Sequence, residues 1–463
     1  MNKIIKNFKN IKYGPAPEDD TEVINWINKI SSPNKNYING KWNTSKGSKK
    51  IKVINPSTNK KLFNLTISTK KDVDLAVNSA KKAQKRWSSI SSFQRSKYLY
   101  ALARLIQKHS RFLAVLESID NGKPIRETRD IDIPLVARHF YYHAGWAEKL
   151  DKNLKPIGVV GQIIPWNFPL LMLAWKIAPA IACGNTVVLK PAEYTSLTAL
   201  YFAELCIKAN IPNGVINIIT GDGSTGELIT SHPEIQKIAF TGSTEIGKKI
   251  IQSTSSTNKK LTMELGGKSP FIVFEDADLD SAVEGVVDAI WFNQGQVCCA
   301  GSRLLIQESI EKKFIKKLKQ RMEKLRIGNP LDKSIDIGAI VAPVQLQKIN
   351  SLVKKGIKDG AKLWQPSWSC PTEGLFYPPS LFTNVTPASF IAQVEIFGPV
   401  LTSLTFRKPS EAVAIANNTP YGLAASIWSE NINLALDIAP KIKAGVIWIN
   451  STNLFDASCG FGG

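Results

Sequence analysis

The most reactive side chain that the sequence offers is the thiol of Cys298, in the stretch GQVCCAG at residues 295–301. Small residues after the thiol leave room for another molecule to approach. A lone Cys is more often a small buried hydrophobe than a nucleophile, so the accompanying groups decide its interpretation. Asn167 offers an amide donor, and Glu264 and Glu395 offer carboxylates. A thiol, an amide and two carboxylates indicate one reaction, in which a nucleophile attacks and acid–base groups assist.

Regular alternation of strands and helices predicts how these side chains are positioned. From Ile157 onward we expect strands at 157–164, 186–189, 215–219 and 238–240, with helices at 170–182 and 196–209. Such alternation specifies a parallel sheet with helices on both faces. Ligands bind these sheets at the carboxyl ends of the strands. The turns that follow the strands there are PWN at 165–167, KPAE at 190–193 and TGS at 241–243.

A second alternating region starts near Leu261, with a strand at 271–274, a helix at 279–292 and then the Cys298 loop. A chain of 463 residues, 43% of them hydrophobic, is too long for one core and predicts several domains. Two earlier helices, at 73–87 and 94–119, are expected to cover the first sheet. The predicted units are a polar N-terminal extension without strong periodicity at 1–36, a dinucleotide-binding domain at 37–123 and 150–262, a bridging segment at 124–149, and a thiol domain at 263–463.

Two glycine-containing turns are candidates for binding a dinucleotide. GDGSTG at 221–226 matches G-x-G-x-x-G, with Gly223 as its second glycine, but it is equally compatible with a tight turn that enters a helix. TGSTEIG at 241–247 is the stronger candidate, because it presents backbone N–H groups and a hydroxyl at a helix start, where a pyrophosphate fits. Lys190 and Glu193 suit ribose hydroxyls, although a surface ion pair is the simpler interpretation. A carboxylate there would repel a 2′-phosphate, which favours NAD over NADP.

Five motifs together resemble the aldehyde dehydrogenase superfamily, in the order in which that family has them, over residues 37–463. They are PWNFP at 165–169, FTGS at 240–243, ELGGK at 264–268, GQVC at 295–298 and EIFGP at 395–399. The resemblance implies an α/β fold with two Rossmann-like parallel-sheet domains. It implies Cys298 as nucleophile, Asn167 as oxyanion donor, Glu264 as general base and Lys176 in proton relay. The cofactor positions that it implies are Ile163, Pro165, Trp166, Lys190, Glu193, Gly223, Gly242, Ser243, Gly247, Leu265, Glu395 and Phe397.

The chemistry of aldehyde oxidation accounts for these residue types. A thiolate that adds to the carbonyl makes the tetrahedral carbon from which hydride leaves to NAD. An amide stabilises the oxyanion, and a carboxylate of raised pKa activates the water that cleaves the thioester. Glu264 therefore favours hydrolysis to a free acid over transfer to coenzyme A. The simpler interpretations are a turn-capping Asn167 and an ion pair between Glu264 and Lys268.

Apolar residues beside the motifs resemble the substrate-tunnel positions of the family and suit aliphatic or aromatic aldehydes. Ordinary core packing is the alternative for each of them. They are Phe168, Met172, Trp175, Phe292 and Phe455.

Two departures from the family pattern bear on assembly. The link between Ala147 and Gly158 is shorter than the family's hairpin, which implies a reduced oligomerisation element, and the usual C-terminal tail is missing after Gly463. We therefore expect a homodimer with a weakened interface. The arm at 13–18 resembles a branch in which two modules are fused in tandem. An NAD-binding scaffold without catalysis is the alternative function.

Bulk properties exclude other classes of protein. The net charge of +21 invites a polyanion site, but the lysines are scattered and are typical of solvated faces. No stretch is apolar enough to span a membrane: the best, 170–183, contains Lys176 and Pro179. The start lacks a secretory signal, and the six cysteines lack metal-site spacing. We expect a cytoplasmic enzyme without a metal and without a specific nucleic-acid partner.

Overall fold

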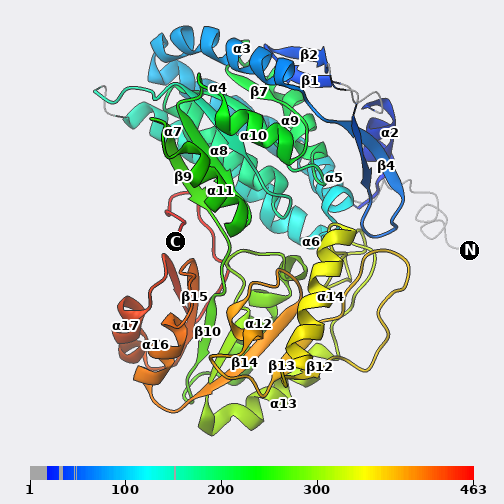
Figure 1. Ribbon diagram of the computed structural model, residues 1–463, viewed down its shortest axis with the longest axis vertical. Helices are drawn as coiled ribbons and strands as arrows, with labels where there is room; N and C mark the ends of the chain where they lie inside the picture. The colour runs from blue at the N-terminus through cyan, green and yellow to red at the C-terminus, as the bar shows by residue number, and fades with distance from the viewer. Residues whose placement is uncertain (1–17, 31–34, 46, 48, 151–152) are drawn as a thin grey trace, which may run out of the picture.

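The computed structural model describes residues 18–30, 35–45, 47, 49–150 and 153–463. The described residues form two α/β units, one above the other in Figure 1, each built on a seven-stranded sheet. A two-stranded hairpin of β3 (Lys50–Ile54) and β4 (Lys61–Thr66) accompanies the first unit. The predicted α/β fold with two parallel-dominated sheets is confirmed. Of the arm at 13–18 that resembles the tandem branch, residues 13–17 lie outside the described residues.

The first sheet has the strand order β2-β1-β7-β6-β5-β8-β9, in which β1 pairs antiparallel with β2 and β7 and the other pairings are parallel. Its central strands β5 and β6 are buried throughout. Runs of Val and Ile suit strands that are covered on both faces. The bounds are β1 Lys35–Ile38, β2 Lys41–Thr44, β5 Val159–Ile163, β6 Thr186–Lys190, β7 Ile216–Ile218, β8 Lys237–Thr241 and β9 Lys260–Glu264.

The second sheet has the order β12-β13-β14-β11-β10-β15-β16, and only the edge strand β12 is antiparallel among these described strands. Parallel strands require helical crossovers, which α12, α13, α14, α16 and α17 supply. The strands are β10 Pro270–Val273, β11 Arg303–Gln307, β12 Lys362–Trp364, β13 Ser380–Thr383, β14 Val400–Phe406, β15 Ala424–Trp428 and β16 Val446–Ile449. The helices are α12 Leu279–Ile290, α13 Glu311–Met322, α14 Pro343–Lys358, α15 Phe390–Gln393, α16 Pro409–Asn417 and α17 Ile432–Ile438, with short 3₁₀ turns at Phe292–Gly295, Glu308–Ile310 and Ala439–Lys441.

Helices cover both faces of the first sheet (Figure 1). A π-helix at Thr128–Asp132 joins α6 to α7. The helices are α2 Thr21–Ile30, α3 Lys70–Ser89, α4 Ser92–Lys108, α5 Ser110–Asn121, α6 Ile125–Glu127, α7 Ile133–Lys149, α8 Pro169–Ala182, α9 Leu197–Lys208, α10 Gly223–Ser231 and α11 Thr244–Thr254.

Three parts of the first unit differ from the sequence prediction. The single helix expected at 94–119 is two helices, because the backbone of His109 (φ −102°, ψ 17°) ends α4 and begins α5. Part of the extension expected to lack periodicity is the helix α2, which buries Val23 and Ile27, one turn apart, and contacts α5. The segment 124–149, predicted as a bridge, contains α7, which packs on α4 and α8 of the first unit.

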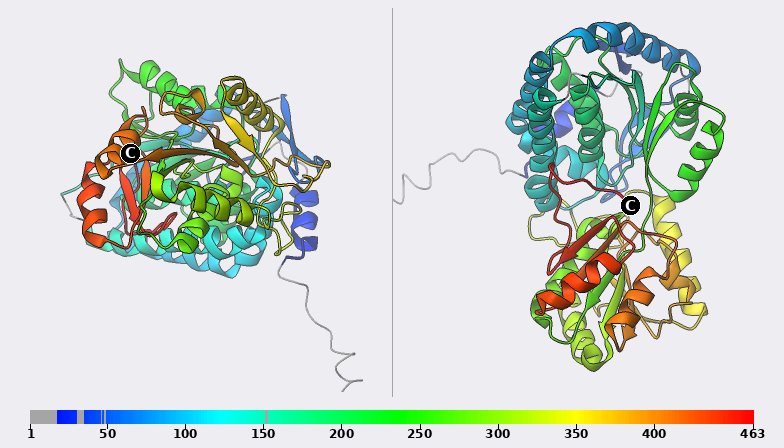
Figure 2. Two further views of the ribbon diagram at one scale, coloured as in Figure 1. Left: turned by 90° about the horizontal axis from the view of Figure 1, so that it is seen from below. Right: turned by 90° about the vertical axis from the view of Figure 1, so that its left-hand side faces the viewer.

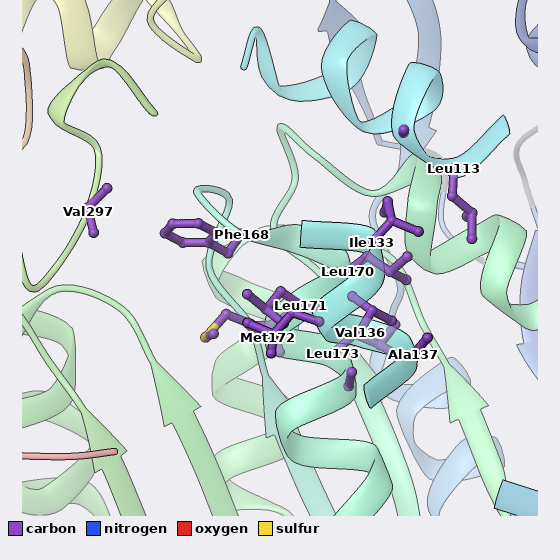
Figure 3. Packing of buried hydrophobic residues seen from close by; sticks show 14 of the residues in the cluster. Leu113, Ile133, Val136, Ala137, Phe168, Leu170, Leu171, Met172, Leu173 and Val297 are labelled. Atoms are coloured by element: carbon purple, nitrogen blue, oxygen red, sulfur yellow. The ribbon is translucent and has the colours of Figure 1, made fainter. Parts of the chain in front are cut away.

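Helix α8, with Phe168 just before it, lies between the helical core of the first unit and the loop of the second unit that carries Val297. Figure 3 shows Leu170 and Leu173 beside residues of α7, whereas Phe168 and Met172 extend toward the loop that carries Val297. One face of α8 is therefore fixed by core packing, and the other reaches the second unit.

The last residues of the chain lie between the two units (Figure 2, right). The ring of Phe461 contacts Trp175 of α8, with 5.3 Å between centroids, and Phe455, with 5.6 Å. Among the described residues, no helix is long and apolar enough to cross a membrane.

Candidate active site

A cavity of about 170 Å³ brings together loops from both units. Its walls come from the carboxyl ends of β8 and β9, from the start of α8, and from the loops that hold Cys298 and Glu395. Ten predicted site residues line it: Pro165, Trp166, Asn167, Gly242, Ser243, Glu264, Leu265, Cys298, Glu395 and Phe397. The thiol, the amide and both carboxylates thus share one cavity.

Asn167 is the buried link between the two units at this site. Its side-chain Nδ2 donates to the backbone carbonyl oxygen of Gln296 at 2.8 Å. Its backbone carbonyl oxygen accepts from the side-chain Nδ2 of Asn293, also at 2.8 Å. A side-chain amide carries two N–H donors. The contact with Gln296 uses one of them, so a second donor remains for an oxygen in the cavity.

Adjacent thiols have different environments. Cys298 is partly exposed, whereas Cys299 is buried and donates to Asn453 Oδ1 at 3.8 Å. A hydrogen bond with Cys298 and burial together raise the pKa of Cys299 far above its usual range. A buried thiol held protonated is a poor nucleophile, so Cys298 is the thiol available for attack.

Close backbone approach holds Glu395 at the cavity. The N–H of Gly267 donates to Glu395 Oε1 at 3.0 Å. A Cβ on Gly266 would lie 2.2 Å from Glu395 Oε2, and one on Gly267 would lie 2.3 Å from the Cys298 carbonyl oxygen. These glycines are therefore required for the carboxylate and the thiol loop to meet. Burial raises the pKa of Glu395, and the hydrogen bond from Gly267 opposes that shift.

Glu264 lies at the end of β9, where two cavities meet. Burial raises its pKa, and the positive charge of Lys176 opposes the rise. Lys176 does not line the first cavity; it lines a second one, of about 780 Å³, which also reaches Glu264. Burial lowers the pKa of Lys176 to about 8. The ion pair considered between Glu264 and Lys268 does not form, since Lys268 is 1% exposed and its Nζ has no hydrogen-bond partner within the described ranges.

Thr241, Gly242 and Ser243 form the turn between β8 and α11 and line the cavity. Ser243 caps α11, and its Oγ accepts from the N–H of Ile246 at 3.3 Å. The hydroxyls of Thr241 and Thr244 are buried without a partner among the residues described. Unused donors at a helix start fit the oxygens of a pyrophosphate, so the residues present fit a dinucleotide.

Five predicted cofactor residues lie outside this cavity: Ile163, Lys190, Glu193, Gly223 and Gly247. Lys190 pairs in register with Ile163 at the carboxyl ends of β6 and β5. Its Nζ donates to the carbonyl oxygens of Pro191 (2.9 Å) and Gly221 (3.0 Å) and lies 3.7 Å from Glu193 Oε2, so the ion pair weighed above is present.

The two remaining glycines have local structural roles. Gly223 begins α10, whose cap Asp222 accepts from the N–H of Ser224 at 2.9 Å, so GDGSTG forms a tight turn that enters a helix. Gly247 lies in α11 and packs against Leu265, since a Cβ there would lie 2.4 Å from Leu265 Cδ2.

Sequence reasoning missed some residues of the site and misplaced one. Gln345 and Lys348 of α14 line the cavity, and Gln345 Nε2 donates to the carbonyl oxygen of Phe397 at 2.8 Å. No local motif marks α14, which reaches the site only through the tertiary fold. Phe461 also lines the cavity. Phe292, expected in the tunnel, does not line it; the ring stacks on Phe168 with 6.0 Å between centroids.

The chain matches the model of the aldehyde dehydrogenase family over residues 42–463. It belongs to the aldehyde dehydrogenase family. The resemblance drawn from the five motifs is thereby confirmed, and so is the class of enzyme.

The match with similar proteins covers most of the length of each of them. Retinaldehyde dehydrogenase 3 of Mus musculus is 44% identical over 445 residues, 92% of this chain and 87% of the relative. A mitochondrial aldehyde dehydrogenase of Arabidopsis thaliana, family 2 member B4, is 42% identical over 469 residues, 98% of this chain and 87% of that protein. The NAD⁺ complex of an aldehyde dehydrogenase from Bacillus cereus superposes with a TM-score of 0.91 at 38% identity, covering 98% of this chain and 94% of that chain.

Proposed function

We propose that this aldehyde dehydrogenase oxidises uncharged, apolar aldehydes to carboxylic acids with NAD, through a thiohemiacetal and a thioester on Cys298. The observation that carries the proposal is the single cavity shared by Cys298, Asn167 and Glu264. The reaction needs a nucleophile, an oxyanion donor and a base around one carbon, and these residues supply all three.

Each residue has one task in the proposed sequence. The sulfur of Cys298 adds to the aldehyde carbon, and the remaining N–H of Asn167 donates to the oxygen that becomes negative. Bound NAD supplies the hydride acceptor, and the loss of hydride leaves a thioester on the sulfur. Glu264 then takes a proton from water as the water attacks the thioester. Lys176, while protonated, favours the ionised form of Glu264. After releasing its own proton into the second cavity, the neutral amine of Lys176 can accept the proton that Glu264 took from water.

The preference for NAD rests on Glu193, which stays beside Lys190 at 3.7 Å. A carboxylate accepts from ribose hydroxyls and repels a 2′-phosphate. Lys190 already donates to the backbone carbonyl oxygens of Pro191 and Gly221. Its ammonium group would have to give up these hydrogen bonds to neutralise a 2′-phosphate.

The cavity walls define the substrate class. Among the described residues that line it, the charged ones are Glu264, Lys348 and Glu395. The remaining side of the cavity is formed by Phe168, Leu171, Met172, Trp175, Val297, Phe455 and Phe461. An anionic substituent placed against these side chains would lose hydration without gaining a partner, so uncharged aliphatic and aromatic aldehydes are favoured over anionic ones. Cytoplasmic location and a homodimer stay predictions from the sequence.

An aldehyde panel tests the proposal. With NAD, kcat/KM for hexanal or benzaldehyde should exceed that for the anionic succinic semialdehyde by about 100-fold or more. Cys298→Ala should abolish NADH formation, whereas the matched Cys299→Ala variant should retain it. Equal rates for Cys298→Ala and the unmodified chain would instead support an NAD-binding scaffold without thiol catalysis.

A further inference from the structure

The turn before Cys298 has an unfavourable backbone. Asn293 (φ 48°) and Gln294 (φ 55°) are both left-handed, and Gly295 (φ 71°) follows. Left-handed backbone costs a residue other than glycine free energy and persists only where the surroundings enforce it. Since this turn leads directly to the nucleophile, the groups that hold it determine where the thiol lies.

Glu127 is one of those groups. Its side chain is 4% exposed, and its Oε2 accepts from the backbone N–H of Asn293 at 2.9 Å. Glu127 ends α6 and is followed by the π-helix, a local irregularity frequent at functional sites. A carboxylate buried here serves no purpose in the proposed chemistry, because it does not line the cavity.

A second buried contact from the same segment reaches the other loop. Lys123 and Asp132 form an ion pair with both side chains 0% exposed, and Lys123 Nζ lies 3.9 Å from the ring centroid of Phe168. Asn121 Nδ2 donates to the carbonyl oxygen of Trp166 at 2.7 Å. Residues 121–132 therefore touch both the residues that flank Asn167 and the turn before Cys298.

Asn293 joins the two loops. Its Nδ2 donates to the carbonyl oxygens of Asn167 (2.8 Å) and Gln296 (3.3 Å), and Asn167 donates in turn to the same Gln296 oxygen. The hydrogen bond to Glu127 fixes the backbone of Asn293 in the orientation that allows its side chain to make these contacts.

We propose that Glu127 is a positioning residue for the oxidation reaction: by accepting from Asn293, it sets the oxyanion donor Asn167 against Cys298. This inference rests on the proposed function, because it assigns Asn167 and Cys298 their roles there. Glu127 touches neither substrate nor cofactor, and its contribution reaches the reaction through Asn293.

Steady-state kinetics of Glu127→Ala test the proposal. We expect kcat to fall about 10- to 100-fold while the KM for aldehyde stays within about threefold, since only alignment in the transition state is lost. Glu127→Gln should restore most of kcat, because its amide oxygen still accepts from Asn293. The matched control is Asp120→Ala: Asp120 is 0% exposed, against 4% for Glu127, and it also accepts a backbone N–H, but from Leu197 of α9 at 2.8 Å rather than from either loop. It should destabilise the fold and leave kcat unchanged.

A double-mutant cycle with Asn167→Ala separates positioning from general damage. If Glu127 acts through Asn167, the loss of kcat in the double variant should be smaller than the product of the two single losses. Multiplicative losses, or an equal loss of kcat in Asp120→Ala, would overturn the proposal. If Glu127→Ala does not fold, Asn293→Ala tests the other half of the link, because it keeps the backbone N–H that Glu127 accepts from and removes the Nδ2 contacts with Asn167 and Gln296. It should lower kcat to a similar extent, and an unchanged kcat would overturn the proposal. A wild-type rate that does not depend on Cys298 would overturn the proposed function instead.

Discussion

The amide of Asn167 donates to the carbonyl oxygen of Gln296 at 2.8 Å, two residues before Cys298. Asn167 belongs to the unit built on the first sheet, and Gln296 belongs to the unit built on the second. This hydrogen bond is one of several that link the two units at the cavity. A change in how the units pack would separate Asn167, the proposed oxyanion donor, from Cys298, the proposed nucleophile.

Replacing Asn167 by Ala should lower kcat about 10²- to 10³-fold, because one oxyanion donor is lost. Rapid-mixing measurements of NADH formation would place the loss in the first half-reaction. The thermal midpoint serves as the control: a fall in kcat that merely accompanies unfolding, or an unchanged kcat, would count against Asn167 as the donor.

Glu264→Gln should form the first equivalent of NADH at a near-normal rate and then turn over slowly, because the thioester is no longer hydrolysed by base-activated water. In the unmodified chain, the deacylation rate should rise with pH through the raised pKa of Glu264, since the base must be ionised. That pH dependence should disappear in the Gln variant. A Gln variant without a burst would show that Glu264 acts before hydride transfer.

Glu193→Gln should weaken the preference for NAD over NADP. The amide keeps the size of the side chain but removes the charge that repels a 2′-phosphate. We expect the ratio of kcat/KM values, NAD over NADP, to fall about tenfold, which corresponds to about 1.4 kcal/mol. An unchanged ratio would mean that cofactor choice is made elsewhere. Glu234→Gln provides a control, since Glu234 lies outside both cavities described above.

Stability should depend on pH through Glu127, whose burial raises its pKa to about 8 in the folded protein. The folded state then binds a proton that the unfolded state releases at lower pH, so the free energy of unfolding should decrease as pH rises from about 5 to about 8. Glu127→Gln should flatten this part of the curve. Denaturant titrations of both forms at several pH values measure the difference; parallel curves would contradict the assignment.

The sequence predicted those parts of the site that are carried by strand ends and local motifs. Asn167 and Ser243 follow the largely buried strands β5 and β8, and Glu264 ends the partly exposed edge strand β9. Their turns are recognisable from short patterns. Gln345 and Lys348 could not be found in this way, because α14 reaches the cavity only after the second sheet has folded. Phe292 was misplaced because an apolar residue near a reactive thiol fits either a tunnel or the core, and in the structure its ring stacks on Phe168.

The fold prediction was correct for both sheets and wrong for single helices, for related physical reasons. The alternation of strands and helices identified both sheets, because parallel strands form continuous apolar runs. The break at His109 depends on one non-helical residue in an otherwise helical pattern. The helix α2 was missed because it is only ten residues long and its burial depends on α5, which supplies the surface that it packs against.

The most direct test of the central claim is mass spectrometry of the Glu264→Gln variant after mixing with hexanal and NAD and quenching in acid. The account predicts one acyl group per chain, attached to Cys298 within the peptide that also contains Cys299. An acyl group on Cys299, or no covalent adduct while NADH is formed, would contradict it.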